Sequence, residues 1–280
     1  MQTPRQQLQW LHSMGVEDEA AETPIGLYRF KSKSPIATKP VNNSGPAIAF
    51  AEPISAPKDM GVAAKKSLFE AAPTMSGNYD GESLAKSANN LDELRAAIEK
   101  FDAIAFKNTA AHTVIADGNP KAGIMFIGEA PGAEEDRQGL PFVGQAGQLL
   151  DKMLAAIQLD RRNNAYISNI LFWRPPGNRT PSPEEMAACM PFVRRHIELI
   201  NPKILVCLGG TAMKAMFEVK DGIMKMRGSW MDFTPSPNHA PIPTLLTYHP
   251  AFLLRTPAYK KDSWADLQDL QKRAKELGIL

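Results

Sequence analysis

The sequence predicts an α/β protein with three layers, α/β/α, in which helices cover both faces of a central four-stranded parallel sheet. The first observation is four short apolar segments that read as buried strands, at residues 124–127, 165–169, 204–208 and 244–248. The second is that stretches with helical periodicity separate them, as in proteins whose right-handed crossovers join parallel strands. With 280 residues, 44% of them hydrophobic, the chain can bury a sizeable core.

Two segments precede the predicted folded domain. Residues 1–22 contain a short helical pattern, from Gln6 to Met14, that can dock on the main domain or on a partner. Residues 23–89 are rich in Pro, Ser, Ala, Lys and Asn and have no sustained hydrophobic period. This composition is typical of a disordered linker, so the sequence predicts a largely disordered N-terminal extension.

Residues 90–280 are predicted to form the folded domain. Asn90 can cap a first helix, at 91–101, because its side-chain oxygen can accept from a free backbone N–H of the first turn. Pro183 fits the first turn of another helix after Ser182. The remaining helices are expected at residues 145–157, 183–200, 211–217 and 262–277.

Charge and cysteine content narrow the class of protein. The formal net charge of +2 does not by itself indicate a nucleic-acid binder, which is recognised by a local basic surface. Two cysteines, Cys189 and Cys207, are too few for a disulfide framework, so we expect a reducing, cytoplasmic compartment. No apolar stretch has transmembrane length and the chain does not begin with a signal-peptide pattern, so we expect no membrane association.

Four notable groups follow the predicted strands. They are the GEAPG segment at 128–132, Asn169, the Gly209-Gly210 pair and His249. Parallel strands bring their carboxyl ends to one edge of the sheet, where open α/β sheets bind ligands. The sequence therefore predicts a site at this edge. For GEAPG alone, an ordinary strand-to-helix turn with a solvated acidic rim remains the alternative.

Three motifs in this part of the chain resemble the uracil-DNA glycosylase superfamily, most closely its family 4. GEAPGAEEDRQGLPFVGQAGQLL is similar to the first family motif, SNILFWRPPGNRTPSPEE to the second, and HPAFLLR to the histidine loop. The resemblance covers residues 101 to about 270. It implies a monomeric enzyme that hydrolyses the bond between uracil and deoxyribose in DNA, after the nucleotide has been rotated out of the stack. It would initiate base-excision repair in the cytoplasm, at a bacterial nucleoid.

The resemblance also implies which residues bind the base. Phe142 matches the phenylalanine that stacks on uracil, and Asn169 the asparagine whose amide can pair with O4 and N3–H. Glu129 and Gly132 belong to the same base-binding loop. His249 matches the catalytic histidine that stabilises the negative charge growing on O2 as the glycosidic bond breaks.

The group that positions the attacking water is less clear from the motifs. In the best-known branch of the superfamily an aspartate stands where this chain has Ala130, and family 4 shares that alanine. Glu129, Glu135 and Asn178 are therefore the candidates for holding water or shaping the site. We expect Glu135 and Asn178 to be the catalytic helpers and Glu129 to brace the loop.

DNA contacts are expected from two loops at the same edge. In the histidine loop, Leu253 and Leu254 belong to an apolar group suited to filling the gap left by a flipped nucleotide, and Arg255 can meet a phosphate. In the proline-rich loop, Arg174 and Arg179 form a plausible phosphate clamp. For Arg179, the alternative is a solvated arginine in a proline-rich connector. For the two leucines, the alternative is burial in the core, where leucines before a loop usually lie.

The chain departs from the family at the cofactor. Most family 4 members carry a 4Fe-4S cluster on four cysteines, and the matching positions here are Ile104, Lys107, Trp173 and Cys189. Such a cluster needs thiolate ligands, so one matching cysteine disfavours it. The sequence predicts no metal and a cluster-free fold in which Ile104 and Trp173 pack in place of the cluster.

Two expectations about partners and activity follow. The substrate is DNA containing uracil, and the short N-terminal helix can recruit a replication or repair protein. Loss of the cluster and the long extension also leave an alternative open, a catalytically weak or inactive DNA-binding member of the same fold.

Overall fold

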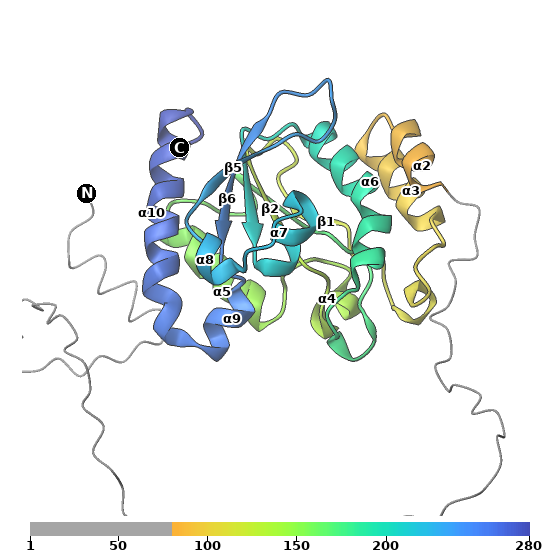
Figure 1. The fold of residues 1–280 in the computed structure, drawn as a ribbon, viewed down its shortest axis with the longest axis horizontal. Helices are drawn as coiled ribbons and strands as arrows, with labels where there is room; N and C mark the ends of the chain where they lie inside the picture. The colour runs from red at the N-terminus through yellow and green to blue at the C-terminus, as the bar shows by residue number, and fades with distance from the viewer. Residues whose placement is uncertain (1–79) are drawn as a thin grey trace, which may run out of the picture. The chain divides into compact units, whose positions relative to one another are not determined.

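A single mixed sheet organises residues 80–280, the part of the chain that the computed structural model describes (Figure 1). The expected N-terminal helix and the predicted linker up to residue 79 lie outside the described residues. The strand order is β1-β3-β2-β4-β6-β5. The strands are β1 (Ala116–Gly118), β2 (Ile124–Gly128), β3 (Ala165–Asn169), β4 (Ile204–Leu208), β5 (Trp230–Phe233) and β6 (Ile242–Thr247).

The four predicted strands form the parallel centre of this sheet, but the sheet is not four-stranded. Strands β1 and β5 add antiparallel edges, so the described part of the chain has six strands. Central parallel strands are buried on both faces and read as apolar runs, whereas an edge strand is half exposed. Strand β1 has only three residues, none of them fully buried, so it gives no such run.

The predicted strand positions agree closely with the structure. Strands β3 and β4 have the predicted bounds. Strand β2 extends one residue further, to Gly128, and β6 begins at Ile242 and ends at Thr247. Because the ends differ by one or two residues only, the groups that follow the four strands lie at the common edge as expected.

The helices are bounded by the predicted capping residues. Asn90 Oδ1 accepts from the Glu93 N–H at 2.9 Å, and Ser182 caps the long helix that starts at Pro183. The α-helices are α2 (Gly81–Ser87), α3 (Leu91–Lys100), α4 (Ala133–Gln138), α5 (Gln145–Ala156), α6 (Pro183–Ile200), α7 (Gly210–Phe217), α8 (Ile223–Met226), α9 (Pro250–Arg255) and α10 (Lys260–Glu276). Short 3-10 turns are η1 (Lys107–Thr109), η2 (Pro176–Asn178) and η3 (Pro257–Tyr259).

Helix α2 moves the start of the folded domain. It lies inside the predicted linker, residues 23–89, so the predicted boundary at residue 90 falls too late. Asp80 caps the helix, Ala85 is buried, and Gly81 lies against Phe101 and Phe192. The helix was missed because seven mostly polar residues contain too few turns to show a hydrophobic period.

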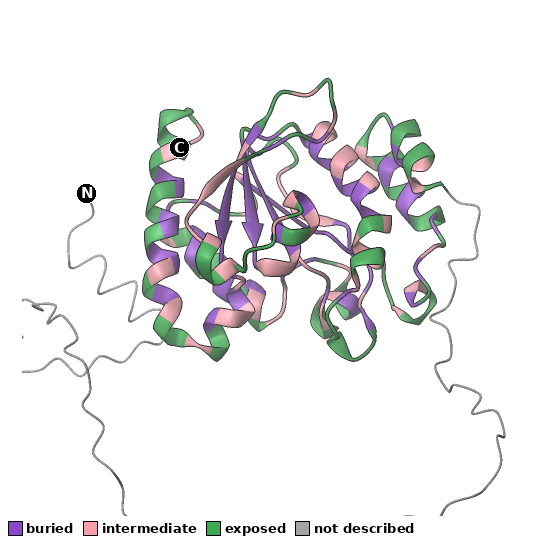
Figure 2. Ribbon diagram, viewed as in Figure 1, coloured by how far each residue is buried: buried purple, intermediate pink, exposed green. Residues whose placement is uncertain are grey.

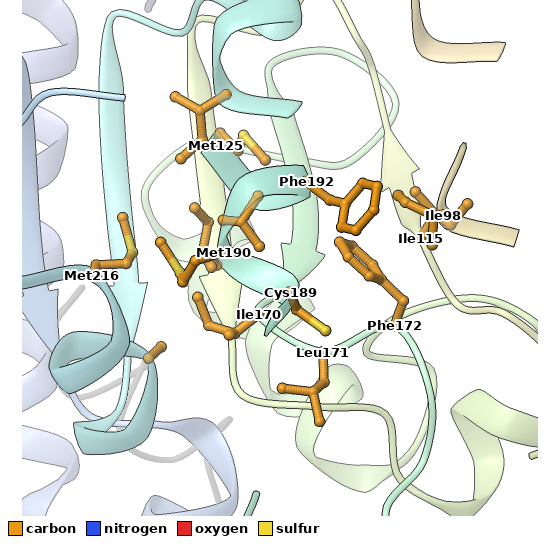
Figure 3. Close-up of a cluster of buried hydrophobic side chains, with 14 of the residues drawn as sticks. Ile98, Ile115, Met125, Ile170, Leu171, Phe172, Cys189, Met190, Phe192 and Met216 are labelled. Atoms are coloured by element: carbon orange, nitrogen blue, oxygen red, sulfur yellow. The ribbon is translucent and has the colours of Figure 1, made fainter. Parts of the chain in front are cut away.

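Two hydrophobic clusters, one on each face of the sheet, confirm the three layers. Along β2, Met125 and Ile127 join the first cluster, whereas Ile124 and Phe126 join the second. Helices α2, α3, α6 and α7 supply the first cluster, and α5, α9 and α10 supply the second. Strands β2, β3 and β4 are buried along their whole length, and Figure 2 draws the centre of the sheet in the purple of buried residues. Figure 3 shows part of the first cluster. Within residues 80–280, no helix has the length and apolar character needed to span a bilayer.

Candidate functional site

The carboxyl ends of β2, β3, β4 and β6 lie side by side at one edge of the sheet (Figure 1). Gly128 at the end of β2 is in register with Asn169 at the end of β3. Gly209 follows β4, and His249 follows β6 after one residue. Helices α4, α5, α7 and α9 begin beyond these ends, so their connections surround the edge.

Gly128 is the point at which two predicted base-binding side chains meet. A Cβ placed on Gly128 would lie 2.5 Å from Asn169 Oδ1 and 2.5 Å from Phe142 Cζ. The Phe142 ring also lies next to the His249 ring, with centroids 5.4 Å apart and planes inclined by 31°. Phe142, Asn169 and His249 therefore converge at this edge of the sheet, and their role in binding a flat ring stays a prediction. We call these three residues and Gly128 the strand-end site.

Asn169 carries a buried polar group without a partner. The residue is only 2% exposed, and its Oδ1 has no hydrogen-bond partner among the described residues. Leaving such an oxygen unpaired costs about 1–3 kcal/mol. An amide held in this state, beside an aromatic face, is suited to a ligand that supplies the missing donor.

His249 is the N-cap of α9, and this contact sets its tautomer. The Ala251 backbone N–H donates to His249 Nδ1 at 3.1 Å. Because Nδ1 accepts, the proton of the neutral ring is on Nε2. Burial, with a smaller contribution from the charge of Arg255, lowers the pKa of His249 to about 4. At neutral pH the ring is thus an uncharged donor through Nε2–H.

The close approach of two connections at this edge requires glycine at Gly209. Its φ is +94°, and a Cβ there would lie 2.9 Å from the Cβ of His249. A side chain at Gly209 would therefore displace the histidine that the cap holds in place.

Glu135 connects two loops of the site. Its carboxylate accepts three backbone hydrogen bonds, from Gly132 at 3.1 Å, Val143 at 3.0 Å and Gly144 at 2.8 Å. These bonds tie the start of α4 to the loop that carries Phe142. Glu135 therefore shapes the site, and its expected role as a catalytic helper stays a prediction.

The other two loop residues predicted to bind uracil are placed by their backbones. Gly132 is the N-cap of α4, and a Cβ on it would lie 2.8 Å from Glu135 Oε2. The Glu129 carbonyl accepts from the Leu171 N–H at 3.0 Å, and its side chain is half-buried. The Glu129 carboxylate follows the end of β2 directly, so it stays a candidate for holding water or bracing the loop.

The proline-rich loop is held together by its own polar side chains. Arg174 Nε donates to Asn178 Oδ1 at 2.7 Å, and Asn178 is exposed. Arg179 makes a two-pronged ion pair with Glu185 of α6, at 2.6 and 2.8 Å, and lies 5.4 Å from the Phe106 ring centroid. The hydrogen bonds that Arg179 donates to Glu185 raise the pKa of Arg179. Arg179 therefore anchors the loop, and a phosphate would have to share it with Glu185.

The histidine loop separates the two predicted leucines. It forms helix α9, in which Leu253 is fully buried in the second cluster while Leu254 is 41% exposed. Consecutive helical residues point about 100° apart, so only one of the pair can face outward. Leu253 cannot contact DNA in this structure, and its predicted role is wrong. Leu254 and the exposed Arg255 remain candidates.

The positions that correspond to the family's cluster ligands are filled by packed side chains. Ile104, Trp173 and Cys189 are buried members of the first cluster, and Figure 3 shows Cys189 among its apolar neighbours. Lys107 places its ammonium 5.4 Å from the Trp173 ring centroid. We call these four residues the core patch.

The core patch does not fit an iron–sulfur cluster. Lys107 Nζ donates to the Phe101 carbonyl at 2.7 Å, and Trp173 Nε1 donates to Thr113 Oγ1 at 3.0 Å. Burial raises the pKa of the Cys189 thiol, whereas cluster ligands are thiolates. In the described part of the chain, no group of three or more His, Cys, Asp and Glu side chains is arranged to hold a metal ion.

One contact that the motifs did not indicate supports the Phe142 loop. Arg161, in the turn before β3, donates to the carbonyls of Pro141 and Phe142. No sequence signal points to it, because an arginine in a polar turn reads as solvated and its partners are about twenty residues away.

Comparisons with known proteins agree with this geometry. The family model described as the uracil DNA glycosylase superfamily matches residues 115–268. A type-4 uracil-DNA glycosylase of Thermotoga maritima is 42% identical over 159 residues, 56% of this chain and 80% of the relative. Relatives of the same name from Archaeoglobus fulgidus and Sulfurisphaera tokodaii are 37% and 40% identical, over 65% and 60% of this chain and 92% and 76% of their own. The chain therefore belongs to the uracil-DNA glycosylase superfamily, among its type-4 members.

Proposed function

We propose that the chain is a uracil-DNA glycosylase, a hydrolase that removes uracil from a flipped-out deoxyuridine in DNA and so initiates base-excision repair. The observation that carries the proposal is the strand-end site, where the unpaired amide of Asn169, the Phe142 ring and the neutral His249 meet. Type-4 uracil-DNA glycosylases at 37–42% identity support the same reaction.

Recognition of the base follows from Phe142 and Asn169. The Phe142 ring offers an apolar face on which a planar base can stack. The Asn169 amide carries a donor and an acceptor, which match uracil O4 and N3–H but meet the opposite pattern on cytosine. A cytosine in the slot would leave the buried Asn169 oxygen unpaired, and an unmatched buried polar group is how such sites reject near-isosteres.

Bond cleavage follows from His249. As the bond between C1′ and N1 breaks, its electron pair leaves on the uracil ring and the sugar becomes oxocarbenium-like. The Nε2–H of His249 can donate to uracil O2, where part of that charge develops. A donor aimed at developing charge is worth about 2.7–4 kcal/mol in other enzymes. Water then bonds to C1′ through its oxygen, and the proton that it loses neutralises the uracil anion.

Positioning of that water falls to Glu129, Glu135 or Asn178, of which Glu135 is also bonded to the backbone. An oxocarbenium-like sugar is reactive enough that water needs to be placed more than deprotonated. For Asn178, release of its bond from Arg174 would free its amide for that purpose.

DNA binding and base flipping are proposed for the loops at the same edge. Leu254 is exposed on α9 and can fill the gap left by a flipped nucleotide, with Arg255 beside it to meet a phosphate. Arg174 is the candidate phosphate contact of the proline-rich loop. We propose that the enzyme works as a monomer, in the cytoplasm at the nucleoid, and without a cluster, on the strength of the core patch.

A base-release assay tests the proposal. Purified full-length chain is incubated with single- and double-stranded oligonucleotides that contain uracil, hypoxanthine or thymine mispairs, and abasic sites are then cleaved. We expect cleavage at uracil. Intact oligonucleotides would contradict the proposal, and salt-dependent binding without release would support an inactive DNA-binding member instead. Removal of residues 1–79, which keeps α2 in the folded domain, in a parallel pull-down tests the proposed replication or repair partner.

A further inference from the structure

Arg161 is held at four points around the loop that carries Phe142. Its side chain is 14% exposed and donates to the Pro141 carbonyl at 2.8 Å and to the Phe142 carbonyl. It also pairs with Asp117 of β1 at 3.0 Å and with Asp151 of α5 at 2.7 Å. The two carboxylates hold the guanidinium in place, so its position relative to the loop is set by the sheet and a helix.

The loop adopts a conformation that needs such support. Phe142 has a φ of 53°, in the left-handed region that residues other than glycine rarely adopt. The chain also packs very closely there, since a Cβ on Gly147 would lie 1.8 Å from the Phe142 carbonyl oxygen. A strained loop persists only where its surroundings over-determine it.

Glu135 and Arg161 hold opposite sides of this loop. The Glu135 carboxylate accepts from the N–H groups of Val143 and Gly144, and Arg161 donates to the two preceding carbonyls. Both sets are charge-assisted hydrogen bonds, which are shorter and stronger than neutral ones. Together they leave the Phe142 backbone little freedom to rotate, and the direction of its ring follows from that backbone.

We propose that Arg161 is a positioning residue for base stacking, which acts by holding the Phe142 ring against Gly128 and His249. The inference rests on the proposed function, because stacking matters only if a base enters the slot. Arginine suits the task because its planar fork of donors can reach carbonyls and carboxylates in several directions at once. A lysine would keep the charge but present its donors from a single atom.

A matched pair of variants tests the proposal. In Arg161→Gln the loop loses its charged donor, whereas Arg162→Gln makes the same charge change at the exposed neighbouring residue. We expect Arg161→Gln to slow single-turnover uracil release about 10- to 100-fold, as small misplacements of a reacting group do, and to weaken inhibition by free uracil. Arg162→Gln should change neither. Equal effects of the two substitutions would overturn the proposal.

A double-substitution cycle separates positioning from general destabilisation. If Arg161 acts through the ring, adding Arg161→Gln to Phe142→Ala should leave the residual rate unchanged while the melting temperature still falls. An equal loss of rate in both backgrounds would show that Arg161 supports the fold alone. If Arg161→Gln does not fold, Arg161→Lys replaces it in the test, because lysine keeps a charge for Asp117 and Asp151. We expect its release rate to lie below that of wild type.

Amide hydrogen exchange tests the clamp without reference to turnover. Val143 and Gly144 N–H groups should exchange faster in Arg161→Gln than in wild type, and unchanged exchange would contradict the clamp. A wild-type protein that releases no uracil would refute the proposed function, whereas normal release by Arg161→Gln would refute the positioning role only.

Discussion

The strand-end site and the core patch lie in the same domain but follow opposite rules. At the strand-end site a buried amide has no partner and Phe142 has a left-handed backbone. In the core patch, Trp173 and Lys107 have hydrogen-bond partners and the other two side chains are fully packed. Unpaired groups and strained backbone mark places where stability has been given up for function, and satisfied packing marks places where it has not. We therefore propose that the strand-end site carries the function and that the core patch contributes packing alone.

The largest effect on stability is expected from a substitution in the core patch. Replacing Trp173, which is 1% exposed, by alanine should lower the free energy of unfolding by about 3–5 kcal/mol, because a large cavity remains. Denaturant unfolding measures it. Trp230→Ala, on the half-exposed edge strand β5, is the control and should cost less. Equal losses for the two would contradict a packing role for the core patch.

A large effect on rate is expected from the strand-end site. His249→Ala should reduce single-turnover uracil release about 10²- to 10³-fold, since the donor to uracil O2 is lost. It should lower the free energy of unfolding by only about 1 kcal/mol, the cost of losing a helix cap. The control is His239→Ala, at a half-buried loop histidine, with an expected rate like that of wild type. A loss of less than a few-fold for His249→Ala would remove the histidine from the mechanism.

A pH series compares two histidines with lowered pKa values, His249 at the strand-end site and His196 of α6, which lies beside Tyr166 of β3. Burial lowers the pKa of His196 to about 4, as it does for His249. The unfolded chain takes up protons near pH 6.5 and the folded one near 4, so the free energy of unfolding should fall as pH drops through that window. The loss for His196 is on the order of 3 kcal/mol.

Activity should not follow stability over the same pH range. His249 stays neutral down to about pH 5, so the release rate of the folded enzyme should be flat with respect to this group from pH 8 to about pH 5. His196→Gln should remove part of the stability slope and leave the rate profile unchanged. A rate that falls with the ordinary histidine pKa near 6.5 would show that His249 titrates normally.

A smaller effect is expected from the two leucines of α9. Leu254→Ala removes an exposed side chain, so stability should change by less than about 0.5 kcal/mol. The activation free energy of uracil release from double-stranded DNA should rise by about 1–2 kcal/mol relative to that from single-stranded DNA. Leu253→Ala should instead lower stability by about 2–5 kcal/mol without changing strand preference. Reversed results would place Leu253 at the DNA.

A small effect on stability is expected at the remaining family cysteine, and no effect on strand preference. Cys189→Ala should cost only about 1 kcal/mol of stability, as removal of one buried atom from an apolar core does. Cys207→Ala, equally buried on β4, is the matched control and should cost a similar amount. A much larger loss at Cys189 than at Cys207, together with loss of colour, would identify it as a ligand.

Much of the scaffold was predictable because periodicity records burial. The apolar runs at β3 and β4 and the cap at Ser182 gave their elements the observed bounds. The edge strands were missed because β1 is short and β5 is half exposed, so neither shows a run. Helix α2 was missed because it is stable through contacts with α6, which a local pattern does not contain.

The meeting of the three candidate side chains was predictable, but the contacts that hold them in place were not. Motifs pointed to Phe142, Asn169 and His249, and parallel strand ends account for their meeting. The hydrogen bonds of Glu135 and Arg161 depend on how loops fold back on each other, which spacing does not encode. Likewise, the burial of Leu253 and the exposure of Leu254 depend on helix α9, whose N-cap is the histidine itself.

The most direct test measures iron and activity in one preparation. The full-length chain is produced with iron supplied, purified without oxygen, and assayed for bound iron, visible charge-transfer absorption and release of uracil from DNA. We predict that the protein releases uracil with far less than one cluster bound per chain, and that a chelator does not lower this activity. Stoichiometric iron whose removal abolishes release would contradict it.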